Sequence, residues 1–310
     1  MSDSPTESHC DDDVKVVHVA GLGRSGSTIL ASVLGEVDSF FAAGEILYLS
    51  KQIALHESCE CGMDLWQCPV WRPAFDAVFA SREQAIAGLR AGPWTRARDL
   101  PRLLWHEQRG GDRLASYRSM LGELLRALRS VTGARVIVET SKRPGYGRVL
   151  AGAPGVEAYV VHLVRDPRAT VYSRLQAPWN AIPATVGAAW TTWQWAIPYL
   201  WRERRDRYIP LRYEDFVRAP RRAIENILAL VDEAPDALPF VDEHTVHLGS
   251  HHMPNGNENR FRSGPVALKA SERWRAGLGR GDALVTTVAT LPLLHHWGYP
   301  VFSWRATPVT

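Results

Sequence analysis

Apolar and polar residues follow two kinds of pattern along the chain. Short, almost continuous apolar runs, such as 14–20, are typical of strands buried on both faces of a parallel sheet. Apolar residues at steps of three and four, as at Leu114, Tyr117, Leu121 and Leu124, are typical of helices with one buried face. We predict strands at 14–20, 39–43, 135–139, 158–164 and 208–213, and helices at 28–37, 112–131, 168–177, 186–206 and 219–232.

The order of these elements predicts the fold class. Strands that alternate with helices favour an α/β protein with three layers, α/β/α, around a central parallel sheet. Gly133 is placed to end the helix at 112–131. Residues 81–111 contain Arg, Gly and Pro without a clean period, so we expect an insertion over the sheet. We expect a disordered tail at 1–13 and a single domain at 14–310.

Composition and charge narrow the class of protein. The 310 residues are 45% hydrophobic and 22% charged, which is ordinary for a soluble enzyme with a full core. A net charge of +3 is too small to favour a nucleic-acid partner. The first residues are polar and acidic, unlike a signal peptide, and no run approaches the ~18 apolar residues of a membrane span. We therefore expect a cytoplasmic protein without a membrane span.

The sequence GLGRSGST, which directly follows the first predicted strand, fits two glycine patterns. Read as G-x-G-x-x-G it predicts a dinucleotide site, and Glu45, 19 residues after Gly26, could bind the ribose. Read as a phosphate-binding P-loop it lacks the lysine, because Ser27 stands in that place. Arg24 does not suit the first pattern, which needs bare backbone close to the ligand. In either case backbone N–H groups before a helix would surround an anion.

A third interpretation removes both difficulties, because Arg24 can supply the cation that the lysine would give. GLGRSGSTIL resembles the 5′-phosphosulfate loop of sulfotransferases that use 3′-phosphoadenosine 5′-phosphosulfate (PAPS). LVRDPRATVYSRL resembles their 3′-phosphate motif, an Arg at a strand end with a Ser eight residues later, here Arg165 and Ser173. ETSKRP and LRYEDFVRAP resemble blocks of the carbohydrate- and tyrosine-modifying branches and their bacterial relatives. The resemblance extends from about residue 14 to 300, and the fold we expect has a P-loop-NTPase-like topology.

Sulfuryl transfer needs a cation at the bridging oxygen, a base on the acceptor and a clamp on the nucleotide. For the cation we select Arg24, and Lys142 as a second candidate that could instead be a solvated lysine after a strand. The base is Glu45, as a matching Glu is in the tyrosine-modifying branch. Its alternatives are a ribose-binding acid or a helix-start carboxylate. The residues that we expect to bind the donor are Gly23, Arg24, Ser25, Gly26, Ser27, Thr28, Arg165, Ser173, Arg260 and Arg262.

Some of these residues have alternative structural roles. Arg165 and Ser173 suit a phosphate clamp, but Arg165 could pair with Asp166 or Glu139 instead. We expect Arg168 and Arg174 at the surface. The loop block GNENRFRSGP, with its two arginines and Ser263, only loosely resembles the C-terminal basic loop of the family.

One predicted helix face is aromatic and apolar and contains Trp190, Trp193, Ile197 and Trp201. We interpret this face as part of the core, with a wall of the acceptor pocket as the alternative.

Cysteine and histidine clusters raise the question of a metal. Cys59, Cys61 and Cys68 are close in sequence, and His56 could be a fourth ligand, but the C-x-C spacing is not that of a usual zinc site. We expect a compact loop with partly buried thiols, with room for one labile disulfide, and no metal. A second group looks like a metal cluster but is interpreted as a polar loop; it contains His244, His247, His251 and His252.

Taken together, the residues favour a sulfotransferase that moves a sulfuryl group from PAPS to an acceptor hydroxyl on a sugar, phenol, peptide or metabolite. The alternative is a nicotinamide- or flavin-dependent Rossmann oxidoreductase, and a nucleotide-binding module without catalysis is third. A Rossmann enzyme has no need for the pair Arg165 and Ser173. If Glu45 is not the base, His18 and His252 are the next candidates.

Overall fold

The computed structural model describes residues 13–92, 95–178 and 181–301. A central parallel sheet has the strand order β2-β3-β1-β4-β5, and a two-stranded antiparallel sheet pairs β6 with β7. The strands are β1 (Val14–Ala20), β2 (Phe40–Gly44), β3 (Val136–Lys142), β4 (Val156–Val164), β5 (Tyr208–Arg212), β6 (Thr245–Leu248) and β7 (Gly264–Ala267). The expected α/β class with a P-loop-like topology is confirmed.

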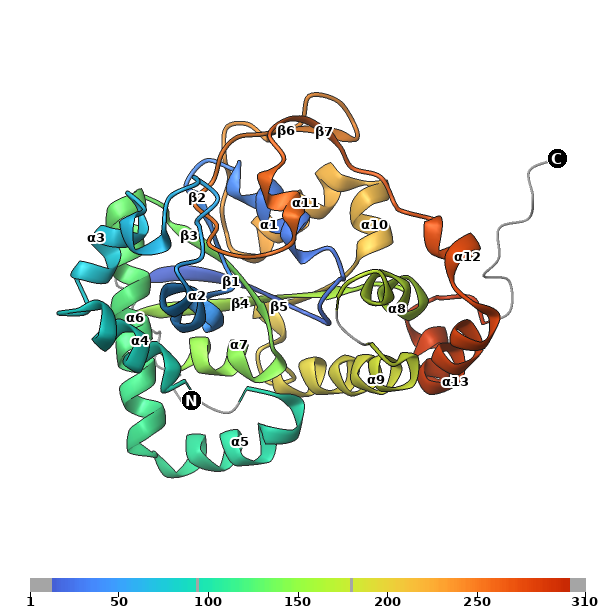
Figure 1. Ribbon diagram of the computed structural model, residues 1–310, viewed down its shortest axis with the longest axis horizontal. Coiled ribbons are helices and arrows are strands. Elements are labelled where there is room, and N and C mark those ends of the chain that lie inside the picture. The colour runs from blue at the N-terminus through green and yellow to red at the C-terminus, as the bar shows by residue number, and fades with distance from the viewer. Residues whose placement is uncertain (1–12, 93–94, 179–180, 302–310) are drawn as a thin grey trace, which may run out of the picture.

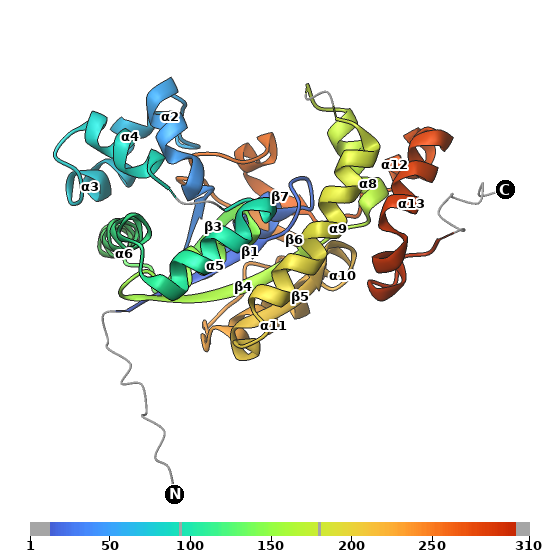
Figure 2. The same cartoon turned by 90° about the horizontal axis from the view of Figure 1, so that it is seen from below.

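Helices cover both faces of the central sheet (Figures 1 and 2). The α-helices are α1 (Ser27–Gly35), α2 (Leu49–Leu55), α3 (Trp71–Asp76), α4 (Arg82–Arg90), α5 (Leu100–Arg109), α6 (Asp112–Thr132), α7 (Pro144–Ala151), α8 (Pro167–Leu175), α9 (Pro183–Leu200), α10 (Tyr213–Arg218), α11 (Pro220–Leu230), α12 (Arg273–Gly277) and α13 (Arg280–His296). Figure 1 shows α1, α10 and α11 on one side of the sheet and α6, α7 and α9 on the other.

The two faces of β1 explain its continuous apolar sequence. Val16 packs in the core with α6 and α7, whereas Val17 packs in the core with α1 and α11. Successive side chains of a strand point to opposite faces, so a strand covered on both sides must be apolar throughout. β1 pairs with β3 on one side and β4 on the other, which puts the loop after Ala20 at the middle of the sheet edge.

Several expected elements are confirmed and others are corrected. The helix expected at 112–131 is α6, and Gly133, with φ of 70°, caps it. The helix expected at 219–232 is α11, which begins at Pro220 and ends at Leu230, and the short helix α10 precedes it. The segment 81–111, expected as an insertion without a clean period, contains α4 and α5. Each buries so few residues that no period is visible: Ala85 and Leu89 in α4, and Leu103 in α5.

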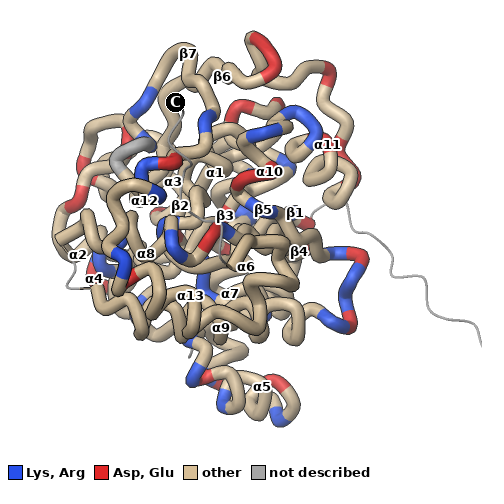
Figure 3. The backbone as a smooth tube through the Cα atoms, turned by 90° about the vertical axis from the view of Figure 1, so that its right-hand side faces the viewer, with Lys and Arg blue, Asp and Glu red and all other residues tan. Residues whose placement is uncertain are grey.

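In the described residues, the charged side chains are spread along the chain, and the helices are not of the membrane-spanning kind. Lys and Arg are interspersed with Asp and Glu along the chain in Figure 3 rather than gathered in one block. No helix in the described ranges is both long enough and apolar enough to span a membrane. The expected tail lies at 1–13, and its first 12 residues fall outside the described part.

Candidate active site

The loop between β1 and α1 packs closely against neighbouring segments at two glycines. Gly21 has φ of 150°, and a Cβ there would collide with the backbone oxygen of Leu163 at the end of β4. Gly26 has φ of 100°, and a Cβ there would collide with the ring of Tyr213, the first residue of α10. Both positions therefore require glycine, for space and for backbone conformation.

The loop ends at the N-terminus of α1, where backbone N–H groups lack partners within the helix. Gly26 is the N-cap, and its oxygen accepts the hydrogen bond from Leu30 at 3.2 Å. Ser25, Ser27 and Thr28 are buried beside these N–H groups, and the Ser25 hydroxyl has no hydrogen-bond partner among the described residues. A buried hydroxyl, backbone donors and the positive end of a helix dipole together suit an anion.

Arginines from the loop, from the connection between β4 and α8, and from α8 converge beside it. Arg24, with φ of 80°, donates from Nε to the Ser173 hydroxyl at 2.9 Å. Arg165 donates from Nη1 to the Arg24 carbonyl at 3.1 Å, and Arg174 donates from Nε to the Gly23 carbonyl at 3.3 Å. Burial, helped by the charges of Arg24 and Arg143, lowers the pKa of the Arg174 guanidinium. Arg174 is therefore half-buried at the site and not on the surface as expected.

Arg165 stacks on an aromatic ring next to the glycine loop. Its guanidinium lies 4.6 Å from the centre of the Tyr213 ring, and its Nε has no hydrogen-bond partner in the described ranges. The indole of Trp190 donates to its carbonyl at 3.0 Å and so fixes its backbone. A cation stacked on an aromatic ring with an unsatisfied N–H is suited to bind an anion.

The carboxylates that could have neutralised Arg165 are engaged elsewhere. Asp166 accepts two bonds from the Arg168 guanidinium, at 2.9 and 2.7 Å. Glu139 contacts His18 at 2.5 Å and accepts from the Ser141 N–H at 2.7 Å. Neither alternative for Arg165 is therefore found. Arg168 is fully buried, which corrects the expected surface position, because its charge is neutralised in place by its neighbour.

Glu45 and Lys142 meet at the carboxyl edge of the sheet because their strands are neighbours. β2 pairs with β3, Glu45 directly follows β2, and Lys142 is the last residue of β3. The Lys142 ammonium donates to a Glu45 carboxylate oxygen and to the Thr140 carbonyl at 2.8 Å. Their side chains are 19% and 13% exposed for Glu45 and Lys142, respectively. Lys142 is thus not a solvated lysine after a strand.

Backbone hydrogen bonds connect Lys142 to the glycine loop and Glu45 to Asn255. The carbonyl of Lys142 accepts from the Gly21 N–H at 3.2 Å, so the lysine stands beside the start of the loop. The N–H of Glu45 donates to the Asn255 side-chain oxygen at 2.6 Å, and the Asn255 amide donates to the Glu45 carbonyl at 3.0 Å. These two bonds fix the backbone of Glu45 from the opposite side.

Asn255 belongs to a C-terminal segment that crosses the site, residues 251–261. The N–H of Asn257 donates to the Thr28 hydroxyl at 3.2 Å, at the start of α1. Arg260 is half-buried and donates to the Gly256 carbonyl at 3.1 Å; burial lowers its pKa, against the attraction of acidic side chains that include Glu45. Arg262 is exposed. Of the two expected loop arginines, only Arg260 approaches Glu45 and the α1 terminus.

Sequence reasoning missed two residues of the site and misplaced a third. Asn255 gave no signal beyond the turn dipeptide Asn-Gly, and Tyr213 lay in a block read only as a resemblance. His18, a reserve candidate for the base, is fully buried between Glu139 and the Arg143 carbonyl, 3.2 Å away. The aromatic face of α9 is core as expected, since Trp190, Ile197 and Trp201 are buried.

Comparisons with known proteins identify a matching family and solved structures with a similar fold. The model of the Sulfotransferase family matches residues 17–236. The sulfotransferase domain from the Synechococcus PCC 7002 olefin synthase has a similar fold, with a TM-score of 0.55 and 18% identity over 96% of this chain and 99% of that domain. The sulfotransferase domain from the curacin biosynthetic pathway has a TM-score of 0.48 and 17% identity, covering 93% and 98% of the two chains. No curated protein sequence matches.

The matched range contains the features described above. It runs from β1 to beyond the end of α11, and it includes the glycine loop, the pair Glu45 and Lys142, and the pair Arg165 and Ser173. The C-terminal segment with Asn255 and Arg260 follows it. Because the match covers most of the chain, this protein belongs to the Sulfotransferase family.

Proposed function

We propose that this protein transfers a sulfuryl group from PAPS to a hydroxyl group of a sugar, phenol, peptide or metabolite acceptor. The observation that carries the proposal is the hydrogen bond between Arg24 and Ser173. It joins the two segments that the sequence assigns to opposite ends of the same nucleotide. The pair Glu45 and Lys142 stands beside the same loop, through the bond from Gly21 to the Lys142 carbonyl.

The donor supplies a sulfuryl group bonded to a phosphate oxygen. The N–H groups of residues 25–28 and the Arg24 side chain would hold its 5′-phosphosulfate. Arg165 and Ser173 would hold the 3′-phosphate, where a guanidinium and a hydroxyl suit a doubly charged group. Among the described residues, the Ser25 hydroxyl and the Nε atoms of Arg165 and Arg260 have no hydrogen-bond partner, and a bound anion would use these donors.

Glu45 accepts the proton of the acceptor hydroxyl as the acceptor oxygen bonds to sulfur and the bond from sulfur to the phosphate oxygen breaks. The products are the sulfate ester and 3′-phosphoadenosine 5′-phosphate. Negative charge grows on the leaving phosphate oxygen, and Lys142 and Arg24 stabilise it. The contact between Lys142 and Glu45 keeps the base and the leaving-group cation side by side.

The strand order argues against the dinucleotide alternative. In the Rossmann order 3-2-1-4-5-6, the second strand lies next to the first, so an acid at its end reaches the ribose. Here β3 lies between β1 and β2, and Lys142 at the end of β3 occupies the intervening place. Glu45 is therefore one strand further from the glycine loop than a ribose-binding acid would be.

We expect 3′-phosphoadenosine 5′-phosphate to stabilise the protein and NAD to have no effect. A ligand at 100 times its Kd raises the free energy of unfolding by about 2.7 kcal/mol. Thermal denaturation with and without each ligand measures this effect as a rise of Tm. A rise with NAD and none with the bisphosphate would favour the oxidoreductase instead.

We expect Ser173→Ala to weaken binding of 3′-phosphoadenosine 5′-phosphate by roughly 10- to 150-fold, the loss of one hydrogen bond to a charged group, about 1.5–3 kcal/mol. Binding of adenosine 5′-phosphate, which lacks the 3′ group, should change much less. Calorimetry with both ligands separates the two losses, and Ser116→Ala, an exposed serine of α6, is the matched control. Equal losses for both ligands would assign Ser173 to the other phosphate.

A further inference from the structure

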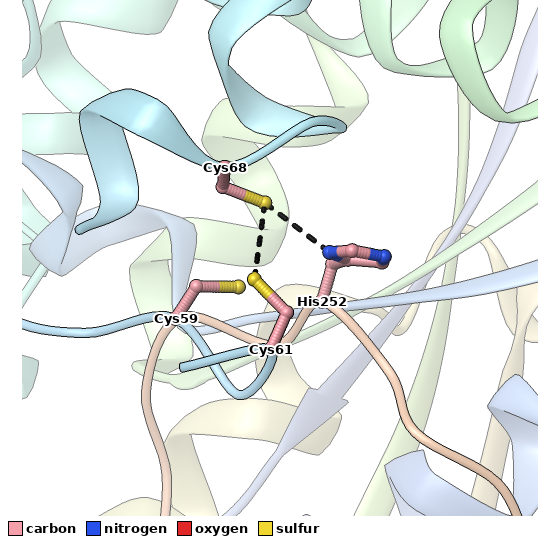
Figure 4. A group of neighbouring side chains, drawn as sticks. All are labelled: Cys59, Cys61, Cys68 and His252. Atoms are coloured by element: carbon pink, nitrogen blue, oxygen red, sulfur yellow. Dashed lines mark hydrogen bonds between the residues drawn. The ribbon is translucent and has the colours of Figure 1, made fainter. Parts of the chain in front are cut away.

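The three cysteines of the 59–68 loop and one histidine of the C-terminal segment point toward a common centre (Figure 4). The Sγ atoms of Cys61 and Cys68 are 3.8 Å apart, and the Sγ of Cys68 is 3.2 Å from Nδ1 of His252. One ligand atom from each of Cys59, Cys61, Cys68 and His252 lies within 4.8 Å of all the others. We infer that these four side chains form a structural zinc site, which is separate from the donor-binding loop.

The spacing of the ligand atoms suits a tetrahedral ion. With Zn–S bonds of about 2.3 Å, tetrahedral angles put two sulfurs about 3.8 Å apart, as they are in Cys61 and Cys68. A Zn–N bond of about 2.0–2.1 Å puts nitrogen about 3.6 Å from each sulfur, so His252 needs only a small shift. Four protein ligands leave no open coordination position, which is typical of a structural site and not a catalytic one.

The backbone around the cysteines is built to present sulfur. The Gly62 N–H donates to the Cys59 carbonyl at 2.9 Å, and the Cys59 N–H donates to the Met63 carbonyl at 2.8 Å, which closes a tight turn. Gly62 has φ of 84°, a conformation that favours glycine in this turn. The turn thereby brings the sulfurs of Cys59 and Cys61 side by side, as Figure 4 shows.

Three hydrogen bonds hold His252 over the thiols. The Trp71 indole donates to the His252 carbonyl at 2.7 Å. On either side, the His251 N–H donates to the Glu60 carboxylate at 3.1 Å, and the Glu60 N–H donates to the Met253 carbonyl at 3.1 Å. The loop and the histidine are thus bracketed together although 184 residues separate Cys68 from His252.

The histidine makes zinc a better explanation than a disulfide. A disulfide between Cys61 and Cys68 would need two sulfurs only and would leave Cys59 and the His252 ring without a role. All three cysteines are free thiols in the structure. Three thiolates and one imidazole are a ligand set that zinc binds with high affinity. His56, the ligand considered from the sequence, instead contacts Asp64 at 2.9 Å and is exposed.

A metal here would anchor the segment that crosses the active site. From His252 the chain continues to Pro254, whose carbonyl accepts from Gln52 at 3.0 Å, and then to Asn255, which binds both backbone groups of Glu45. Arg260 lies further along the same segment. Zinc would therefore cross-link the cysteine loop to the covering segment and hold Asn255 in register with Glu45.

Metal analysis of the purified protein tests the site directly. We expect about one zinc per chain in protein prepared without chelators and under reducing conditions, because the four ligands close one tetrahedral site. Cys61→Ser and His252→Ala should lose the metal, His252→Cys should retain it, and His247→Ala, an exposed histidine of β6, is the matched control. Cobalt added to the metal-free wild-type protein should give the intense visible absorption of a tetrahedral thiolate site.

The cobalt spectrum of the wild-type protein tests the site even where a variant fails to fold. Absence of both zinc and cobalt binding in the reduced wild-type protein would overturn the inference. So would an intact mass and thiol count that show a disulfide between Cys61 and Cys68 in freshly purified protein. Hydrogen exchange supplies a readout independent of turnover: removal of zinc should accelerate exchange in residues 251–261 and leave β1 unchanged. Unchanged exchange in that segment would contradict the anchoring role.

Discussion

Glu45→Gln is expected to lower the turnover rate by roughly two to four orders of magnitude, the usual contribution of a general base. Glutamine keeps the length and the hydrogen-bonding reach of glutamate and loses the capacity to accept a proton. Binding of 3′-phosphoadenosine 5′-phosphate should stay nearly unchanged, because Arg24, Arg165, Ser173 and the loop N–H groups are proposed to hold it. A sulfate-transfer assay at saturating donor measures the rate, and calorimetry measures the affinity.

The control for this variant is Glu225→Gln, an exposed glutamate of α11. It should retain full turnover. A dinucleotide site predicts the opposite pattern for Glu45→Gln, since loss of a ribose ligand reduces cofactor affinity and not the rate at saturation. If affinity collapses while the saturated rate survives, Glu45 is not the base. His18 cannot then replace it without rearrangement, because it is buried against Glu139.

The sequence predicts well those parts of the fold that depend on local pattern. The strand at 14–20 needs apolar side chains on both faces, and this leaves a continuous run that is visible without tertiary information. The predicted strand at 135–139 is extended in the structure to Lys142. Thr140, Ser141 and Lys142 are polar, and strand pairing with β1, not hydropathy, carries them into the sheet.

Charged residues inside the protein were harder to place. Arg168 is expected at the surface but is fully buried, although an arginine without a partner costs free energy to bury. In the structure Asp166, two residues earlier, accepts both of its hydrogen bonds, and the pair is buried together. Arg174 approaches the Gly23 carbonyl because α8 packs against the glycine loop. The contact of Arg174 cannot be identified from residue spacing, since it depends on how the elements pack, whereas the partner of Arg168 is a near neighbour in the sequence.

Sequence motifs likewise identify only some of the residues of the candidate site. Arg24, Glu45, Lys142 and Ser173 could be selected from the sequence because each lies in a motif or at a strand end. Asn255 could not, because it reaches Glu45 from 210 residues away and only tertiary folding brings them together. His252 was set aside for the same reason. Its partners are cysteines nearly two hundred residues earlier, and the neighbouring histidines suggested a polar loop instead.

Lys142 contacts the glycine loop through its backbone and Glu45 through its side chain. Its φ of 67° is in the left-handed region, an uncommon conformation for a residue with a side chain. There its carbonyl accepts from Gly21 at the loop, while its ammonium contacts Glu45. A single residue thus links the glycine loop to Glu45, the proposed base. Backbone strain of this kind occurs at sites where geometry serves function.

Lys142→Met is expected to lower turnover by roughly two to three orders of magnitude, as the loss of one donor to a developing oxyanion does. Methionine keeps most of the length of lysine and removes the charge; Lys51→Met, an exposed lysine of α2, is the matched control. The same substitution in the Glu45→Gln background separates two roles. A further loss of about tenfold or more there shows that Lys142 acts on the leaving oxygen. No further loss would make it a positioning residue for Glu45, and full activity of the single variant would remove it from the mechanism.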